Sequence, residues 1–332
     1  METFAEGYER LIGSPVPPID NPQLAHYWNL PVSNLCEVDT PPIDPALEER
    51  HRLYFYLLMA IGWNYWNGYK RGRSGTYPWN DPPEPEDPPW FDGEYRGHNI
   101  LAIGVDYLGR VVDFDFNHNA LFNSSAEHAE ARLVRRLYGL ANVGGAWGPG
   151  PVSSTGTTSL NGLTVYTSLE SCAQCSGIMA LANVSQVAFM QTDPGEYLIG
   201  RILYNLTPPT FRAPLPISGA EINLPQFEEL NTKFGEFVEA VPSRPFWESA
   251  DGTQKDNFPS ITSFLCTSQA RAIYLEGKQQ LASYGKGTEL QFPAYYPPGV
   301  SGALTNKQVL ANISVFLVYA VEVANRGTPH TI

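Results

Sequence analysis

Two short segments of the chain hold residue types that together could bind a metal ion and use it chemically. The first, 125–130, contains His128 and Glu130, and the second, 169–175, contains Cys172 and Cys175. One imidazole and two thiols, with a fourth position left open, make up the ligand set of a catalytic zinc ion. A carboxylate two residues after the histidine could take a proton from a zinc-bound water. These residue types at this spacing indicate a hydrolytic zinc site.

The pairing of His-x-Glu with Cys-x-x-Cys resembles the signature of the zinc-dependent cytidine and deoxycytidylate deaminase superfamily. The similarity extends over roughly residues 95–240. It is strongest to the branch with a histidine ligand, which includes cytosine, guanine and tRNA adenosine deaminases and editing cytidine deaminases. The resemblance implies that Zn²⁺ is bound by His128, Cys172 and Cys175, and that Glu130 transfers protons. Where the family has proline before the first cysteine, this chain has Ser171, so we expect a differently shaped pocket.

The resemblance also implies a set of residues that contact the substrate. In the family an asparagine at the end of the second strand has this role, and both Asn117 and Asn119 fit it. Asn117 has the spacing to the histidine that is found in the tRNA-type enzymes, whereas Asn119 belongs to a local His-Asn pair. Either could also be an ordinary turn residue. Ala129, within the histidine motif, and Ser171 complete the expected set.

The elements that must position these residues can be predicted from hydrophobic patterning. Strands are expected at 99–105, 110–116, 163–169, 186–190 and 215–222. Helices are expected from Ser124 or Ser125 to about 140, and at 172–183, 197–205 and 225–241. Strands that alternate with helices predict a three-layer α/β/α sandwich. The resemblance implies a cytidine deaminase-like fold with a five-stranded mixed sheet, in which the last two strands are parallel.

The chain outside this core is expected to form two mainly helical extensions. Residues 1–94 are predicted to be a proline-rich arm, irregular over 1–45, followed by a helix over 46–66 with Asp44 as its cap. That helix is apolar on most sides, so its aromatic residues should fill the core instead of stacking on a base. Residues 95–241 are predicted to be the deaminase core, and 242–332 a C-terminal extension with helices at 260–284 and 305–325.

Charge bears on which substrates the chain could bind. The 332 residues have a formal net charge of −13, which repels phosphate backbones and favours a free nucleobase, nucleoside or nucleotide. A basic and aromatic run at 69–73 leaves tRNA or single-stranded nucleic acid as an alternative. Three arginines of the histidine helix are expected to form a solvated face instead of a phosphate site: Arg132, Arg135 and Arg136.

Further expectations follow from the sequence. A non-catalytic zinc scaffold or interaction protein is the second alternative, although retention of Glu130 argues against it. Cys36 and Cys266 are expected to be free thiols in a reducing compartment. Without an apolar leader or a membrane-spanning run, the sequence predicts a cytoplasmic protein with no membrane partner. The apolar face of helix 305–325 should pack on the core or on a second copy in a homo-oligomer.

Overall fold

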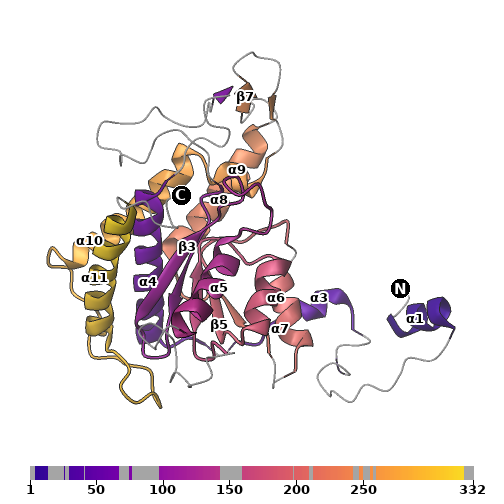
Figure 1. The fold of residues 1–332 in the computed structure, drawn as a ribbon, viewed down its shortest axis with the longest axis horizontal. Coiled ribbons are helices and arrows are strands. Elements are labelled where there is room, and N and C mark those ends of the chain that lie inside the picture. The colour runs from indigo at the N-terminus through magenta and orange to yellow at the C-terminus, as the bar shows by residue number, and fades with distance from the viewer. Residues whose placement is uncertain are drawn as a thin grey trace.

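A five-stranded mixed sheet lies at the centre of the molecule, with helices on both of its faces (Figure 1). The protein is described by a computed structural model. The described residues are 4–13, 26, 30–40, 42–66, 75–76, 97–142, 159–196, 198–208, 212–241, 247–249, 255–256 and 259–324. The basic run at 69–73 and the predicted boundaries at residues 94 and 242 lie outside these ranges.

The central sheet has the strand order β3-β2-β4-β5-β6. β2 pairs antiparallel with β3 and with β4, whereas β4, β5 and β6 are mutually parallel. The prediction of a five-stranded mixed sheet with two parallel final strands is therefore confirmed. The strands are short, and most of their residues are buried because helices cover both sides: β2 (Leu101–Val105), β3 (Val111–Phe116), β4 (Thr164–Thr167), β5 (Gln186–Phe189) and β6 (Leu215–Ser218).

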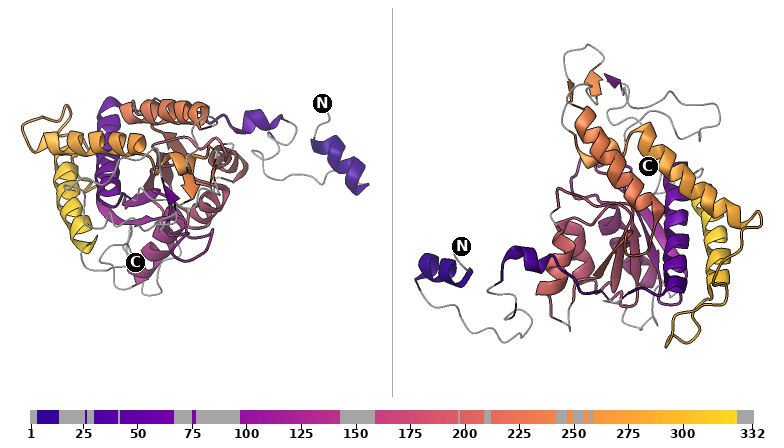
Figure 2. Two further views of the ribbon diagram at one scale, coloured as in Figure 1. Left: turned by 90° about the horizontal axis from the view of Figure 1, so that it is seen from above. Right: turned by 180° about the vertical axis from the view of Figure 1, so that it is seen from behind.

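The helices form the two outer layers of a sandwich (Figures 1 and 2). One layer contains α5 (Ala129–Asn142), α6 (Ala173–Leu181) and α7 (Ile199–Leu206). The other contains α4 (Pro45–Asn64) and α8 (Pro225–Ala240), and α10 (Ser268–Tyr284) and α11 (Asn306–Ala324) pack against α4. The predicted three-layer α/β/α arrangement is confirmed.

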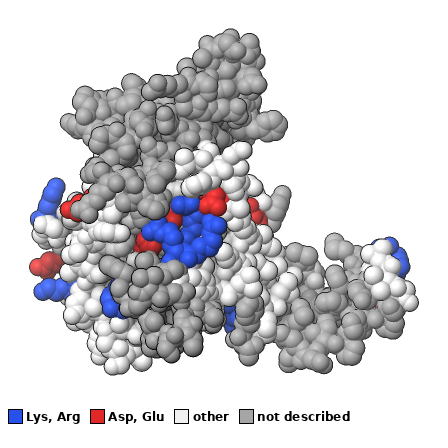
Figure 3. Space-filling model, in the orientation of Figure 1, with Lys and Arg blue, Asp and Glu red and all other residues white. Residues whose placement is uncertain are grey.

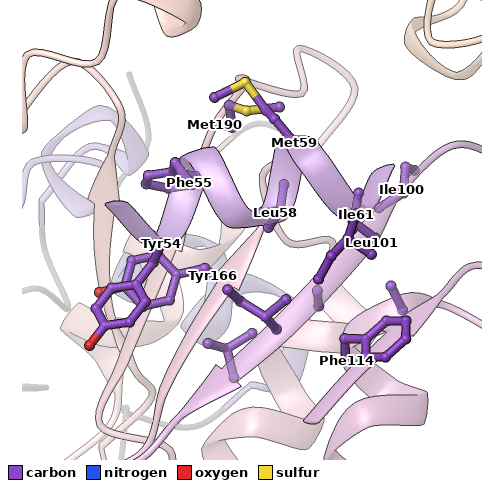
Figure 4. Packing of buried hydrophobic residues seen from close by; sticks show 14 of the residues in the cluster. Tyr54, Phe55, Leu58, Met59, Ile61, Ile100, Leu101, Phe114, Tyr166 and Met190 are labelled. Carbon is purple, nitrogen blue, oxygen red and sulfur yellow. The ribbon is translucent and has the colours of Figure 1, made fainter. Parts of the chain in front are cut away.

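Helix α4 is buried on nearly all sides because helices and the sheet surround it. Asp44 caps it by accepting a hydrogen bond from the Ala46 N–H, and Pro45 occupies the first helical position, both as predicted. Its aromatic residues fill the core: Tyr54 and Phe55 pack against Tyr166 of β4, with ring centroids 4.8 and 5.3 Å apart (Figure 4). The expectation that these rings pack in the core is confirmed.

The predictions for the ends of the chain need correction. Residues 1–45, expected to be irregular, contain helices α1 (Phe4–Ile12) and α3 (Val32–Leu35). The helix predicted over 260–284 is interrupted, because Thr267 ends one turn and caps the next helix by accepting from the Ala270 N–H. It divides into α9 (Ile261–Phe264) and α10. A hydroxyl residue inside an apolar pattern can end a helix by capping a new one.

The start of α5 was also predicted incorrectly. The Ser124 hydroxyl accepts a hydrogen bond from the Ala126 N–H, so this serine stabilises a turn before the helix. The helix itself begins at Ala129, whose N–H donates to the side-chain oxygen of Asn117 at 2.7 Å. An asparagine at the end of β3 thus satisfies the first N–H of the helix that carries Glu130.

One hydrophobic cluster includes residues from all three predicted segments, such as Leu57, Val165 and Ile313. Helices α10 and α4 approach closely where Gly277 faces the Met59 side chain. A small second sheet also joins residues from both extensions: β1 (Gly75–Thr76), β7 (Trp247–Ser249) and β8 (Lys255–Asp256). The division at 94 and 242 stays a prediction, but the described helices on either side share one core.

No helix within the described ranges has the length and apolar character needed to cross a bilayer. Cytoplasmic location and homo-oligomer formation stay predictions. Val315 and Val318 lie on an exposed side of α11, 71% and 60% accessible.

Buried His51 makes stability depend on pH. Its Nδ1 lies 2.7 Å from the Tyr166 hydroxyl. Burial, together with Arg50 and Arg52, lowers the pKa of His51 from 6.5 to about 4. Between these values the unfolded chain binds a proton that the folded chain does not, so the free energy of unfolding falls as the pH drops. We expect this group to cost about 2 kcal/mol of stability between pH 7 and pH 5, a loss absent from His51→Gln, as measured by urea unfolding.

Comparing wild type with His51→Gln separates the pH dependence due to His51 from that of a group with the opposite effect. Burial raises the pKa of Asp113 to about 6, so the folded chain takes up a proton at Asp113 as the pH falls, which adds stability. This contribution is the same in the wild-type and His51→Gln proteins and cancels in their difference. An equal change in stability between pH 7 and pH 5 in both proteins would contradict the role of His51.

Candidate zinc site and adjoining cavity

The predicted metal ligands meet where α5 and α6 begin side by side. His128 directly precedes α5, Cys172 is the N-cap residue of α6, and Cys175 lies in its first turn. The His128 Nδ1 is 3.3 Å from the Cys172 Sγ and 3.6 Å from the Cys175 Sγ. These ligand atoms all lie within 4.8 Å of one another. Residues far apart in sequence therefore converge as the motif predicted.

The donor set fits a zinc ion. One imidazole nitrogen and two sulfurs are ligands that zinc prefers, and a catalytic site leaves its fourth position to water or substrate. Among the described residues, the group that could hold a metal consists of His128, Cys172 and Cys175 alone. Glu130 is close to this group but is not a member of it. The arrangement is that of an open site with an acid beside it.

The ionisation of Cys172 suits metal binding. A hydrogen bond from Cys175, aided by His128, lowers the pKa of Cys172 to about 4. The hydrogen bond with Cys172 in turn raises the pKa of His128. Thiolate is the form of cysteine that binds metals, so Cys172 is shifted toward its metal-binding form. The hydrogen bond with Cys172 raises the pKa of the Cys175 thiol, whose proton a bound metal would have to displace.

Glu130 is buried beside the ligands and held by two hydroxyl groups. Thr167 and Ser171 each donate a hydrogen bond to its Oε1 at 3.1 Å, while its Oε2 lies 3.4 Å from the Cys175 Sγ. Burial raises the pKa of this carboxyl group above its ordinary value. A raised pKa favours an acid that both accepts and returns a proton near neutral pH.

A cavity of about 150 Å³ opens onto the site. His128, Glu130 and Cys172 form one part of its wall, and Asn117 and Ile100 form another. Further polar residues of the lining are His98, Glu170, Asp193, Glu196 and Thr262. The cavity places Glu130 and two of the ligands where a small molecule could reach them.

The two asparagines occupy different places. Asn117 lines the cavity, and its side-chain oxygen is already engaged by the Ala129 N–H, so the amide NH₂ group is the part left to contact a ligand. Asn119 instead has its Nδ2 2.9 Å from the Nε2 of His98, which is itself a lining residue. Asn117 therefore lines the cavity, whereas Asn119 contacts His98. The contact of either asparagine with substrate stays a prediction.

Ala129 and Ser171, the other two residues of the expected substrate set, are not among the described residues that line the cavity. The Ala129 N–H bonds Asn117, and the Ser171 hydroxyl bonds Glu130. Both therefore contact residues of the cavity wall. Their direct contact with substrate stays a prediction.

Several lining residues were not predicted as site residues from the sequence, among them Thr262 and His98. Thr262 comes from α9, far along the chain, and no motif marks it. His98 directly precedes the segment predicted to be the first strand of the core, and no motif marks it either. The hydrogen bond from the Asn99 side chain to the Leu265 carbonyl, 2.8 Å long, ties α9 to the start of β2 and brings Thr262 to the cavity. Long-range contacts of this kind leave no local signal.

The arginines of α5 form a basic cluster on one face of the molecule (Figure 3). Each pairs with a carboxylate at N–O distances of 2.8–3.1 Å: Arg132 with Asp115 and Glu127, Arg135 with Glu127, and Arg136 with Asp113 and Asp115. Three carboxylates neutralise three guanidinium groups, which argues against a phosphate site. The expectation of a solvated face holds for Arg135, whose side chain is 53% exposed, but the Arg132 side chain is only 10% exposed.

Removal of one ligand tests the metal site directly. We expect Cys172→Ala to lower the zinc content from about one ion per chain to near zero after dialysis against a weak chelator, because two ligands bind zinc poorly. Elemental analysis of the purified protein measures this. Cys36→Ala removes a thiol outside the site and should keep the metal. Stoichiometric zinc in Cys172→Ala would show that the metal lies elsewhere.

The strand order and the helix-borne histidine and cysteines define a three-layer α/β protein with a candidate zinc site, as the resemblance implied. Neither the protein-family models nor the curated proteins compared with the chain give a match. Solved structures of several deaminases do match parts of it.

One is a structure from work on A-to-I editing by tRNA:A34 deaminases, at 23% identity and a TM-score of 0.29, covering 36% of this chain and 82% of that chain. Guanine deaminase from Nitrosomonas europaea matches at 17% identity and a TM-score of 0.27, over 39% of this chain and 71% of its own. A Thermotoga maritima diaminohydroxyphosphoribosylaminopyrimidine deaminase/reductase matches at 15% identity and a TM-score of 0.33, over 59% of this chain and 43% of its own. At these values the likenesses assign no substrate, and the chemistry must come from the chain's own residues.

Proposed function

We propose that the chain is a zinc-dependent hydrolase that removes an exocyclic amine from a nucleobase, nucleoside or nucleotide. The observation that carries the proposal is the buried carboxylate of Glu130, which lies beside the converged His128, Cys172 and Cys175 and lines the same cavity as His128 and Cys172. A structural zinc site has no use for a non-ligating acid at this position. A hydrolytic site needs one to move protons.

Each residue then has a chemical task. His128, Cys172 and Cys175 would hold zinc, which when bound acidifies a water molecule and makes it a nucleophile near neutral pH. Glu130 would take one proton from the attacking water and deliver it to the ring nitrogen. It would then take the remaining proton of the added hydroxyl group and deliver it to the amine, which leaves as ammonia while the oxygen stays on the ring carbon. Asn117 lines the cavity, and its NH₂ group could donate a hydrogen bond to an acceptor on the ring.

The cavity supports a small substrate. Its volume of about 150 Å³ is equivalent to about five water molecules and is small for a ligand pocket. Four of its lining residues are carboxylic acids, and the α5 arginines are already paired. A neutral heterocycle with N–H donors suits such walls better than a phosphate-rich strand does. A base within tRNA or single-stranded nucleic acid is the alternative substrate.

A non-catalytic zinc scaffold is the other alternative, and it would need a sealed site or a fourth protein ligand. The cavity beside Glu130 and the three-residue ligand group in the described part of the chain both support the enzyme. If the protein acted only by binding a partner, the buried Glu130 would have no chemical task.

An assay of ammonia release tests the proposal. The zinc-loaded protein is incubated with a panel of free bases, nucleosides, nucleotides and oligonucleotides at equal concentration. We expect turnover of at least one member, with free bases or nucleosides preferred over oligonucleotides. Preference for an oligonucleotide, with binding that weakens steeply as salt rises, would favour the nucleic-acid alternative because phosphate contacts release counterions. Absence of ammonia from every member, with zinc bound, would favour the scaffold.

A further inference from the structure

We propose that Ser171 is a positioning residue for Glu130. Its hydroxyl and that of Thr167 hold one oxygen of the Glu130 carboxylate, so that the other oxygen is directed at the metal ligands. The inference rests on the function proposed above. It gives a specific task to the serine that replaces the family's proline.

The geometry of the carboxylate carries this inference. Ser171 Oγ and Thr167 Oγ1 both donate to Oε1, each at 3.1 Å, and Oε2 is left on the side of Cys175, at 3.4 Å. The three hydrogen-bonded side chains are almost completely buried, with exposures of 3%, 0% and 3% for Ser171, Thr167 and Glu130. Two donors on one oxygen define which edge of the carboxylate faces the site.

The serine hydroxyl comes from a fixed segment of backbone. On one side the Glu170 N–H donates to the Gln191 carbonyl at 2.8 Å, and on the other the Ser176 hydroxyl donates to the Ser171 carbonyl at 3.3 Å. A donor on a rigid support can orient its acceptor at little further cost in conformational entropy. The hydroxyl is thus built into the turn that leads to Cys172.

Proline at this position could not do the same. Its side chain has no donor, so Thr167 alone would hold Oε1. Glutamate has several rotatable bonds, and loss of one of two hydrogen bonds would let the carboxylate leave the geometry needed for proton transfer. The serine therefore restricts the acid through a contact that the family's own residue cannot make.

The first test separates turnover from substrate binding. In Ser171→Ala we expect kcat to fall about tenfold or more, which is the rate equivalent of one hydrogen bond to a charged group, with KM changed less than about twofold. The zinc content should stay at that of the wild type. The matched control is Ser168→Ala, since the buried Ser168 hydroxyl accepts a hydrogen bond from the Leu101 N–H and does not contact Glu130. This control should keep its kcat.

The second test needs no activity. Denaturant unfolding gives the equilibrium constant for unfolding of Ser171→Ala in the wild-type background and in a Glu130→Ala background. If the serine acts through Glu130, Ser171→Ala should raise the unfolding constant about tenfold in the first background and less than about twofold in the second. Ser168→Ala should raise it equally in both.

The outcomes are distinct for the two proposals. An equal effect of Ser171→Ala in both backgrounds, or an unchanged kcat, would overturn the positioning role. A protein that releases no ammonia from any substrate but still couples Ser171 to Glu130 would overturn the deaminase proposal and leave the contact itself established.

Discussion

The Glu130→Gln protein should keep its zinc and lose turnover by about 100- to 10,000-fold, the range that general acid–base catalysis contributes. Glutamine preserves the shape of the side chain and can still accept hydrogen bonds from Thr167 and Ser171 at its carbonyl oxygen. It cannot take a proton from the attacking water or deliver one to the leaving amine. The loss should therefore appear in kcat, measured by ammonia release on the best substrate of the panel.

The zinc content of the variant separates chemistry from metal binding. Glu130 is not a member of the three-residue ligand group, so elemental analysis should give the same zinc per chain as in the wild type. Glu127→Gln is a matched control, because Glu127 directly precedes His128 but pairs with Arg132 outside the cavity. It should keep kcat within a few fold. Turnover retained by Glu130→Gln would remove Glu130 from the reaction.

The convergence of the candidate ligands and the acid beside them could be predicted from sequence because each motif is local. His128 and Glu130 lie at the start of one helix, and Cys172 and Cys175 at the start of another, so each pair is fixed by a single turn of backbone. The strands that lead into both helices have clear apolar patterns. Once the two helices pack together, the pairs must meet.

The remainder of the cavity depends on contacts between distant residues. Thr262 reaches the wall because Asn99 bonds the Leu265 carbonyl, and His98 is oriented by Asn119. No sequence pattern links the two members of either pair. The interruption at Thr267 was missed for a related reason, since a buried threonine can stand inside a helix or cap a new one, and packing decides which.

Contacts between distant residues also hold the C-terminal part of the chain. The sequence predicted the helices of 242–332 and an apolar face on helix 305–325, but none of the polar contacts that also hold this part of the chain. In the structure, buried polar residues of α4 bind the segment that joins α10 to α11. The Glu49 carboxylate accepts from the N–H groups of Gln291 and Phe292, at 2.6 and 2.9 Å. The side chain of Asn306 donates to the Ala46 carbonyl at 3.0 Å.

Arg50 is the centre of this network. Its Nε donates to the Asn306 Oδ1 at 2.9 Å, and its Nη2 donates to the carbonyls of Tyr295 and Leu304. The residue is only 4% exposed. Its guanidinium and the buried Glu49 carboxylate are linked through the Asn306 side chain, which accepts from Arg50 and donates to Glu49. Removing one member would leave the others without partners and away from water.

Arg50→Met should therefore lower the free energy of unfolding by about 3–5 kcal/mol, the cost of breaking a buried charge network from one side. Arg135→Met removes an exposed arginine that pairs with Glu127 and should cost less than about 1 kcal/mol. Urea unfolding measures both. A loss below about 1 kcal/mol in Arg50→Met would show that the C-terminal helices are held by apolar packing alone.

The slope of the Arg50→Met transition distinguishes two ways of losing this stability. If the C-terminal segment detaches before the sheet unfolds, the transition should broaden, because less surface is exposed in each step and the m-value falls. If α4 and the sheet unfold with it, the m-value should match the wild type while the midpoint drops. We expect the second result, since α4 packs on β2 and β4 as well as on α10 and α11. Detachment of α10 and α11 would expose buried residues of α4 to water, and the sheet that α4 covers would lose stability with it.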